Sequence, residues 1–135
     1  DTDDVLLIGA TTDPTTGALE QHFRGGMDDV RIIRRELTEA DIEDLYRIAP
    51  AFQMQFEERH GATVFADTSD SGNDGTCAGD DCPSVGYAME GRLGNGAAFD
   101  GLGDGVQVPD DPVLRQPGEF SVGAWVMPNE DRWGD

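Results

Sequence analysis

The segment FADTSDSGNDGTCAGDDC, residues 65–82, holds the residue types in this chain that are best suited to chemistry. It concentrates aspartates, glycines and both cysteines, and it has almost no apolar side chains. Three interpretations are open: a disordered acidic linker, a calcium-binding loop, and a surface loop closed by a disulfide.

The spacing of Cys77 and Cys82 favours a local disulfide. A structural zinc site needs about four ligands, and neither histidine is close to the cysteines in sequence. A redox CxxC motif is absent as well. The pair therefore predicts a disulfide formed in an oxidising compartment, which favours an extracellular or cell-surface protein.

An EF-hand loop is excluded by the spacing of the acids. Asp67, Ser69 and Ser71 alternate before Gly72, as in the first half of such a loop. The bidentate acid at the twelfth position is missing, because Ala78 stands there. Calcium binding by this segment therefore needs another arrangement of ligands.

The composition restricts the class of protein and its partners. The chain has 135 residues, enough for one domain with a core, and a formal net charge of −19 with arginine as its only basic residue type. Such a chain repels nucleic acid and anionic membranes, so neither is expected as a partner. No apolar run is long enough to insert into a membrane. We interpret the charge as a solvated acidic surface suited to salty surroundings.

The segments between turns predict an all-β fold with one short helix. Eighteen glycines and seven prolines indicate many turns, which favours a loop-rich β protein over a helical one. The helix is expected near residues 38–47, where Thr38 can cap the amino end and Asp41 can complete a capping box. Strands are expected within residues 5–9, 27–35, 51–58, 91–101, 104–114 and 118–128.

The order of these segments resembles a known family. GGMDDVRIIRRELTEADIEDLY resembles the closing strand and short helix of laminin-G-like domains, which belong to the concanavalin A-like lectin/glucanase superfamily. FQMQFEERHGATVFADTSDSGNDGT, GRLGNGAAFDGLGDGVQVPDDPVL and FSVGAWVMP resemble the opening half of the same domain, in the family order. The resemblance implies an antiparallel jelly-roll β-sandwich.

The two parts of the family pattern are exchanged in this chain, because the carboxyl-terminal part comes first and the amino-terminal part follows it. Residues 1–50 resemble the end of one laminin-G-like module, and residues 51–135 resemble the start of the following one. A window from a tandem array and a single permuted module both explain this order, and we favour the array. It predicts that residues 30–34 and 52–56 lie in different sandwiches, or are completed by other chains.

The resemblance also implies a structural calcium ion. Related jelly rolls often hold calcium between the first loop and an acid near the closing strand. On that resemblance the ligands are Asp67, Asn73, Asp74 and Asp28, although Asp28 would belong to the preceding module. The alternative is that these residues satisfy the amides of their own turns.

Catalysis is not expected, although the superfamily includes glycoside hydrolases. Their signature Glu-x-Asp-x-x-Glu is absent, and Glu130 and Asp131 are adjacent, so on a strand they would point to opposite faces. Trp125 and Trp133 could stack on a sugar, but we expect Trp125 to lie in the sandwich core.

The resulting functional hypothesis is a non-catalytic extracellular recognition or adhesion module of a larger surface protein. It would bind carbohydrate or an extracellular protein, with calcium in a structural role. The alternative is a structural subunit of an extracellular filament, assembled by strand exchange between copies or neighbouring modules.

Overall fold

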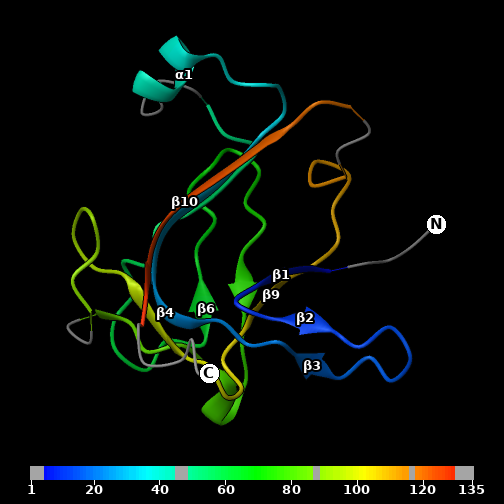
Figure 1. Ribbon diagram of the computed structural model, residues 1–135, viewed down its shortest axis with the longest axis vertical. Helices are drawn as coiled ribbons and strands as arrows, with labels where there is room; N and C mark the ends of the chain where they lie inside the picture. Colours follow the sequence, from blue (N-terminus) through cyan, green and yellow to red (C-terminus); the bar gives the residue numbers. More distant parts are fainter. Residues whose placement is uncertain (1–4, 45–48, 87–88, 116–117, 130–135) are drawn as a thin grey trace, which may run out of the picture.

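The computed structural model describes residues 5–44, 49–86, 89–115 and 118–129 (Figure 1). Within these ranges, antiparallel β-strands make up most of the regular structure. The helical parts are α1 (Glu39–Glu43) and a 3-10 turn (Gly79–Asp81). The prediction of an all-β fold with one short helix is confirmed.

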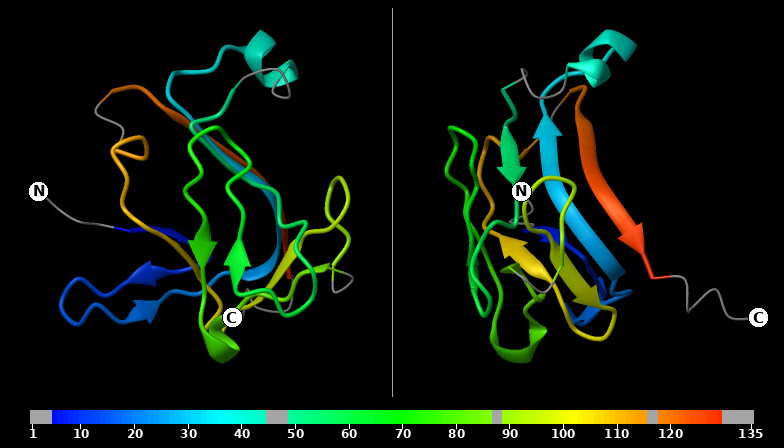
Figure 2. Two further views of the ribbon diagram at one scale, coloured as in Figure 1. Left: turned by 180° about the vertical axis from the view of Figure 1, so that it is seen from behind. Right: turned by 90° about the vertical axis from the view of Figure 1, so that its left-hand side faces the viewer.

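The strands form two four-stranded sheets and one small hairpin. The first sheet has the order β1 (Leu6–Ile8), β9 (Val106–Val108), β7 (Gly75–Thr76) and β6 (Val64–Phe65). The second has the order β10 (Ser121–Pro128), β4 (Arg24–Ile33) and β5 (Phe52–Met54), and β8 (Ala97–Asp100) also pairs with β4. The hairpin joins β2 (Thr11–Thr12) to β3 (Leu19–Glu20). Figure 2 shows β4 and β10 side by side along one side of the molecule.

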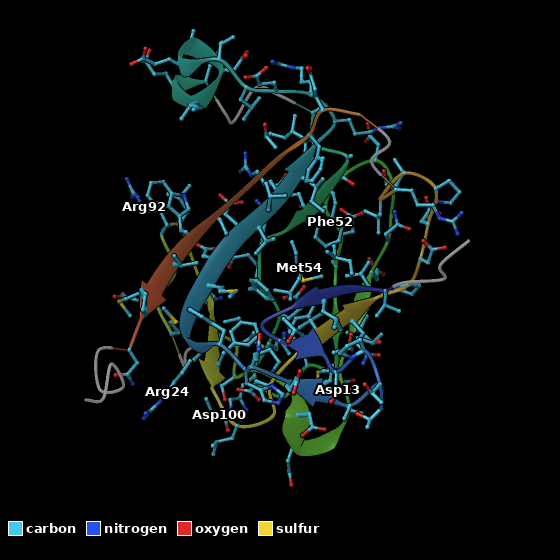
Figure 3. All side chains as sticks on the ribbon, turned by 45° about the vertical axis from the view of Figure 1, so that its right-hand side comes forward. Asp13, Arg24, Phe52, Met54, Arg92 and Asp100 are labelled. Carbon is cyan, nitrogen blue, oxygen red and sulfur yellow. A yellow bond between two sulfur atoms is a disulfide. The ribbon has the colours of Figure 1, made fainter. Side chains whose placement is uncertain are left out.

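The two sheets pack face to face around one hydrophobic core. Phe52 and Met54 of β5 are fully buried and lie between the sheets (Figure 3). The other buried members of the core are Ile8, Val30, Ile32, Phe56, Phe65, Val85, Ala97, Phe99, Val106 and Val108. Since these residues come from before and after residue 50, both parts of the sequence build the same core.

The prediction that residues 30–34 and 52–56 lie in different sandwiches is wrong for this chain. β4 and β5 pair directly, with Val30 opposite Met54 and Ile32 opposite Phe52. All four side chains are buried on one face of the sheet, so this pairing removes the apolar faces of both strands from water. The assignment of residues 1–50 and 51–135 to successive modules stays a hypothesis about a parent protein.

The sandwich is joined along one side and open along the other. Beyond β5, a bridge between Met54 and Asp67 and a hydrogen bond from Thr68 N to Gln53 O (2.8 Å) connect the two sheets. On the opposite side, β10 pairs only with β4, and β1 pairs only with β9, among the described residues. The edges of β1 and β10 are therefore free within that part of the chain.

The start of α1 forms as its sequence predicts. Asp41 N donates to the Thr38 hydroxyl (3.3 Å), and Thr38 N donates to Asp41 Oδ2 (2.9 Å), which completes the capping box. Arg35 also donates to both Asp41 oxygens. Together, Arg35 and Thr38 hold the pKa of Asp41 far below its usual range. The predicted continuation through residues 45–47 lies outside the described residues.

Candidate functional site

Asp67 organises the acidic loop by accepting hydrogen bonds from three backbone amides. Its Oδ1 accepts from Gln53 N (3.0 Å) and Ser69 N (3.0 Å), and its Oδ2 accepts from Asn73 N (2.9 Å). Asp74 supports the same loop, since its Oδ1 accepts from Asp67 N (2.9 Å). The loop is therefore folded onto β5 rather than extended as a linker.

The hydrogen bonds to Asp67 also set its protonation state. Burial by itself would raise the pKa of this carboxyl group. The amides of Gln53, Asn73 and Ser69 and the Ser69 hydroxyl favour the ionised form and outweigh burial, so the pKa lies below its ordinary value. Asp67 is thus a buried, ionised carboxylate whose charge stabilises the fold.

The four predicted calcium ligands do not converge on one site. Asp28 Oδ2 accepts from Arg92 N (2.6 Å) and Leu93 N (3.3 Å), so Asp28 holds a different turn. Burial raises the pKa of Asp28, and the neighbouring charge of Asp29 adds to this effect. The described residues contain no group of three or more His, Cys, Asp or Glu side chains arranged to hold a metal ion.

Asp67, Asn73 and Asp74 lie in one loop, but they do not form a ready cage for calcium. Both Asp67 oxygens and one Asp74 oxygen already accept amide hydrogen bonds. The Asn73 side-chain nitrogen is buried and has no hydrogen-bond partner among the described residues. The arrangement fits the alternative interpretation, in which these residues satisfy the amides of their own loop.

The predicted disulfide between Cys77 and Cys82 is confirmed. The two Cα atoms are 5.2 Å apart, and the bond closes a loop with a sequence separation of 5. It pins the 3-10 turn at residues 79–81 beside β7. The bond fits an oxidising setting such as the cell exterior.

Replacing both cysteines with serine is expected to lower the free energy of unfolding by about 2 kcal/mol, as loop-closure entropy predicts for so short a ring. Urea denaturation of the double variant, beside the oxidised wild type, measures this loss. The reduced wild type also lacks the bond that restricts the unfolded chain. Its free energy of unfolding should therefore match that of the double variant. Equal stability of all three forms would show that the bond does not constrain the unfolded chain.

The expectation that Trp125 lies in the core is wrong. Its side chain is 52% exposed on the outer face of the second sheet, where it stands opposite Asp28 of β4. The Arg92 guanidinium lies over its ring, 5.3 Å from the centroid, and Figure 3 shows Arg92 on the outer side of β10. β10 is an edge strand, and half of the Trp125 surface stays open to solvent.

Trp125 borders a hollow of about 640 Å³ between β10, β4 and α1. A buried polar pair lines it: Arg31 Nη2 donates to both Asp29 oxygens (3.0 Å each), and Gln53 Nε2 donates to Asp29 Oδ1 (3.0 Å). The remaining lining residues are Ile33, Glu36, Leu37, Ile42, Glu43, Ser121, Val122, Gly123 and Ala124. The hollow thus combines apolar walls, an aromatic ring and fixed polar groups, as small-ligand sites do.

A smaller hollow of about 230 Å³ also borders Trp125. Asp28, Met89, Arg92 and Met127 line it, and none of these four residues lines the larger hollow. Arg92, whose guanidinium lies over the indole, therefore lines the smaller hollow and not the larger one. A ligand in the larger hollow can contact the Trp125 ring, which borders it.

A third hollow, of about 630 Å³, lies at the far end of β4, between Arg24 and Asp100 (Figure 3). Asp100 Oδ1 accepts from Leu102 N (2.7 Å), so this carboxylate closes a turn. His22 also lines this hollow and is half-buried. Of the described Phe, Tyr and Trp residues only Phe23 borders it, and Trp125 remains the better platform for a ligand.

The sequence reasoning did not identify Asp29, Arg31 and Arg92 as parts of a site. Because Arg31 alternates with Val30 and Ile32, the sequence places its side chain on the outer face of the strand. It does not show that this face is buried at Arg31. Arg92 comes from a distant turn, and only the fold brings it to Trp125. Trp133, the other tryptophan considered for stacking, lies outside the described residues.

Comparison of the chain with protein-family models, curated proteins and solved structures found no match. Within the described residues, no helix is long and apolar enough to span a membrane. We therefore infer the function from the geometry of this chain.

Proposed function

We propose that this protein is a non-catalytic extracellular recognition module that binds carbohydrate on the outer face of β10 and β4. The observation that carries the proposal is the half-exposed Trp125 at the border of a hollow lined by the buried Arg31–Asp29 pair. The apolar face of a sugar packs on an aromatic ring, and its hydroxyl groups need fixed donors and acceptors nearby.

The absence of catalysis is part of this proposal. Hydrolysis of a glycosidic bond needs two carboxyl groups that face the sugar, one of them free to act as base or nucleophile. Asp29, the buried carboxylate of the hollow, is held by Arg31 and Gln53 through both of its oxygens. This geometry suits Asp29 to binding better than to proton transfer.

We also propose that the fold is part of a laminin-G-like jelly roll. Two antiparallel sheets with one shared core, and the pairing of the expected closing strand β4 with the expected opening strand β5, support this assignment. The first and last strands of this family lie close together, and β4 and β5 are neighbours in the same way. The extracellular setting is supported by the Cys77–Cys82 disulfide.

Trp125→Ala is expected to lower affinity for a bound saccharide by roughly tenfold or more, because the stacking surface is lost. A glycan array identifies the saccharide, and calorimetric titration with the best-bound disaccharide measures the affinity. Trp125→Phe should retain part of it, and Phe120→Ala serves as a control at an equally exposed aromatic residue of the same strand region. Binding that is unchanged in Trp125→Ala would refute the placement of the site.

Calcium in a structural role remains a proposal for the loop that contains Asp67, Asn73 and Asp74. Its support is the resemblance and the buried Asn73 side-chain nitrogen, which has no described partner. Rotation of that amide would present its oxygen instead. Chelation with EDTA tests this proposal: a lower melting temperature supports calcium, and an identical melting curve contradicts it.

The second candidate function is a structural subunit that assembles through its strands. The free edge of β10 favours contact between copies or neighbouring modules, because unpaired strand edges accept further strands. Saturable saccharide binding distinguishes a recognition module from a subunit that only assembles.

A further inference from the structure

The open edge of β10 is long and unprotected. β10 spans eight residues, and among the described residues its only partner is β4. Val122, Val126 and Met127 are each more than half exposed. Soluble proteins usually protect such an edge with charges, a bulge or a covering element. Here the irregularity in the β10–β4 pairing lies on β4, where Asp29 has a φ of 57°, so the outer edge of β10 stays regular.

The charge pattern indicates contact with another surface at this edge. Residues 120–129 form the longest run without a charged residue in a chain of net charge −19. Two copies of such an acidic chain repel one another over most of their surfaces. At β10 the repulsion is weakest, because no acid lies on the strand itself.

The sequence of β10 is complementary to itself. An antiparallel pair of β10 strands, centred on Ala124, places Val122 opposite Val126 of the second copy. Both valines point to the core side, since their partners on β4 are Ile32 and Met27. Directly opposite residues share a face, so the two valine pairs would cover each other's exposed apolar surface.

The same register also suits the outer face. Trp125 of one copy stands opposite Gly123 of the other, so two bulky side chains do not face each other across the axis. At the ends of the strand, Glu119 falls opposite Asn129, whose amide donates to the Arg24 carbonyl oxygen (3.2 Å).

The other free edge of the described sandwich, on β1, is a poorer match. β1 has a free edge but only three residues, so it would leave most of β10 unpaired. We propose that the β10 edge is an interface between two copies of this chain, which form a symmetric dimer by antiparallel β10–β10 pairing centred on Ala124. The dimer joins the second sheets of the two copies into one continuous sheet. One Trp125 hollow then lies on each side of the twofold axis.

Sedimentation velocity over a wide range of protein concentrations tests the dimer. We expect a monomer–dimer equilibrium that tightens between about 0.1 M and about 1 M NaCl, because salt screens the repulsion between the acidic copies. A protein that stays monomeric at every concentration and salt level would overturn the proposal. Open-ended growth into large assemblies would overturn it too, because a symmetric pair leaves neither copy with a free β10 edge.

Charge exchange at the two valines tests the register. Val122→Glu or Val126→Arg alone should weaken the dimer by roughly tenfold or more, since each places an unpaired charge against a valine twice per dimer. The double variant Val122→Glu/Val126→Arg should restore it, because the two new charges then face each other across the axis. Failure of the double variant to recover association would overturn the register.

A matched double variant controls for charge content. Val122→Glu/Met127→Arg carries the same charges, but Met127 points to the other face and falls opposite Ser121, so the dimer should not recover. All the substituted side chains are more than half exposed, so circular dichroism should show equal folding.

Saccharide titration of the wild type separates the dimer proposal from the recognition-site proposal. A monomer that binds saccharide refutes only the dimer, and a dimer that binds none refutes only the recognition site.

Discussion

Phe56→Ala is expected to lower the free energy of unfolding by about 3–5 kcal/mol, the usual cost of removing a buried aromatic ring. The Phe56 side chain is fully buried. Its ring makes edge-to-face contacts with Phe65 (5.8 Å between centroids) and Phe99 (6.3 Å), so its removal leaves a cavity between the two sheets. Domains of this size are marginally stable, and we expect much of the variant to be unfolded at room temperature.

Urea denaturation followed by circular dichroism measures this effect. Phe120→Ala is the matched control, because it makes the same substitution at a residue that is 52% exposed. The control should lose only a small fraction of the stability lost by Phe56→Ala. Comparable small losses in both variants would contradict a core in which Phe56 joins the two sheets.

Asp67→Ala is expected to lower the free energy of unfolding by about 3 kcal/mol, because three backbone amides lose a buried acceptor. Asp70→Ala, at an exposed acid of the same loop, should have little effect. Thermal and urea unfolding of the two variants give the comparison. A loss in Asp67→Ala no larger than in Asp70→Ala would contradict the organising role of Asp67.

The same substitution also has a pH signature. Because the folded-state pKa of Asp67 lies below its ordinary value of 3.8, its contribution to stability is fully present above that pH. The contribution is lost as the pH falls through the folded-state pKa. The stability difference between wild type and Asp67→Ala should therefore shrink on acidification below about pH 4. A difference that does not change with pH in this range would show that the charge of Asp67 is not what holds the loop.

Much of the fold could be predicted because its signals are local. The capping box of Thr38 and Asp41 predicts the start of α1, and the alternation of Phe52 and Met54 predicts β5. The spacing of Cys77 and Cys82 predicts their bond. Each of these features depends on residues within a few positions of one another, where periodicity and turn chemistry are informative.

What the sequence did not predict depends on contacts between distant segments. The pairing of β4 with β5 within one sheet depends on tertiary packing, and the resemblance to two successive modules pointed the other way. The exposure of Trp125 depends on which strand lies at the edge of the sheet. Alternation of apolar residues distinguishes the two faces of a strand, but it does not show which face is covered. Asp28 was grouped with Asp67 by resemblance, yet its hydrogen bonds go to residues 92 and 93.

Amide and indole chemical shifts during a saccharide titration locate the saccharide on the protein. With the best-bound disaccharide of the glycan array added to the ¹⁵N-labelled chain, we expect shifts of the Trp125 indole and of the amides of Val122 and Gly123. Because the loop around Asp67 lies outside the hollow, the amides of Ser69 and Asn73 should not move. Shifts confined to that loop, or no shift of the Trp125 indole at saturating disaccharide, would contradict a recognition site on the outer face of β10 and β4.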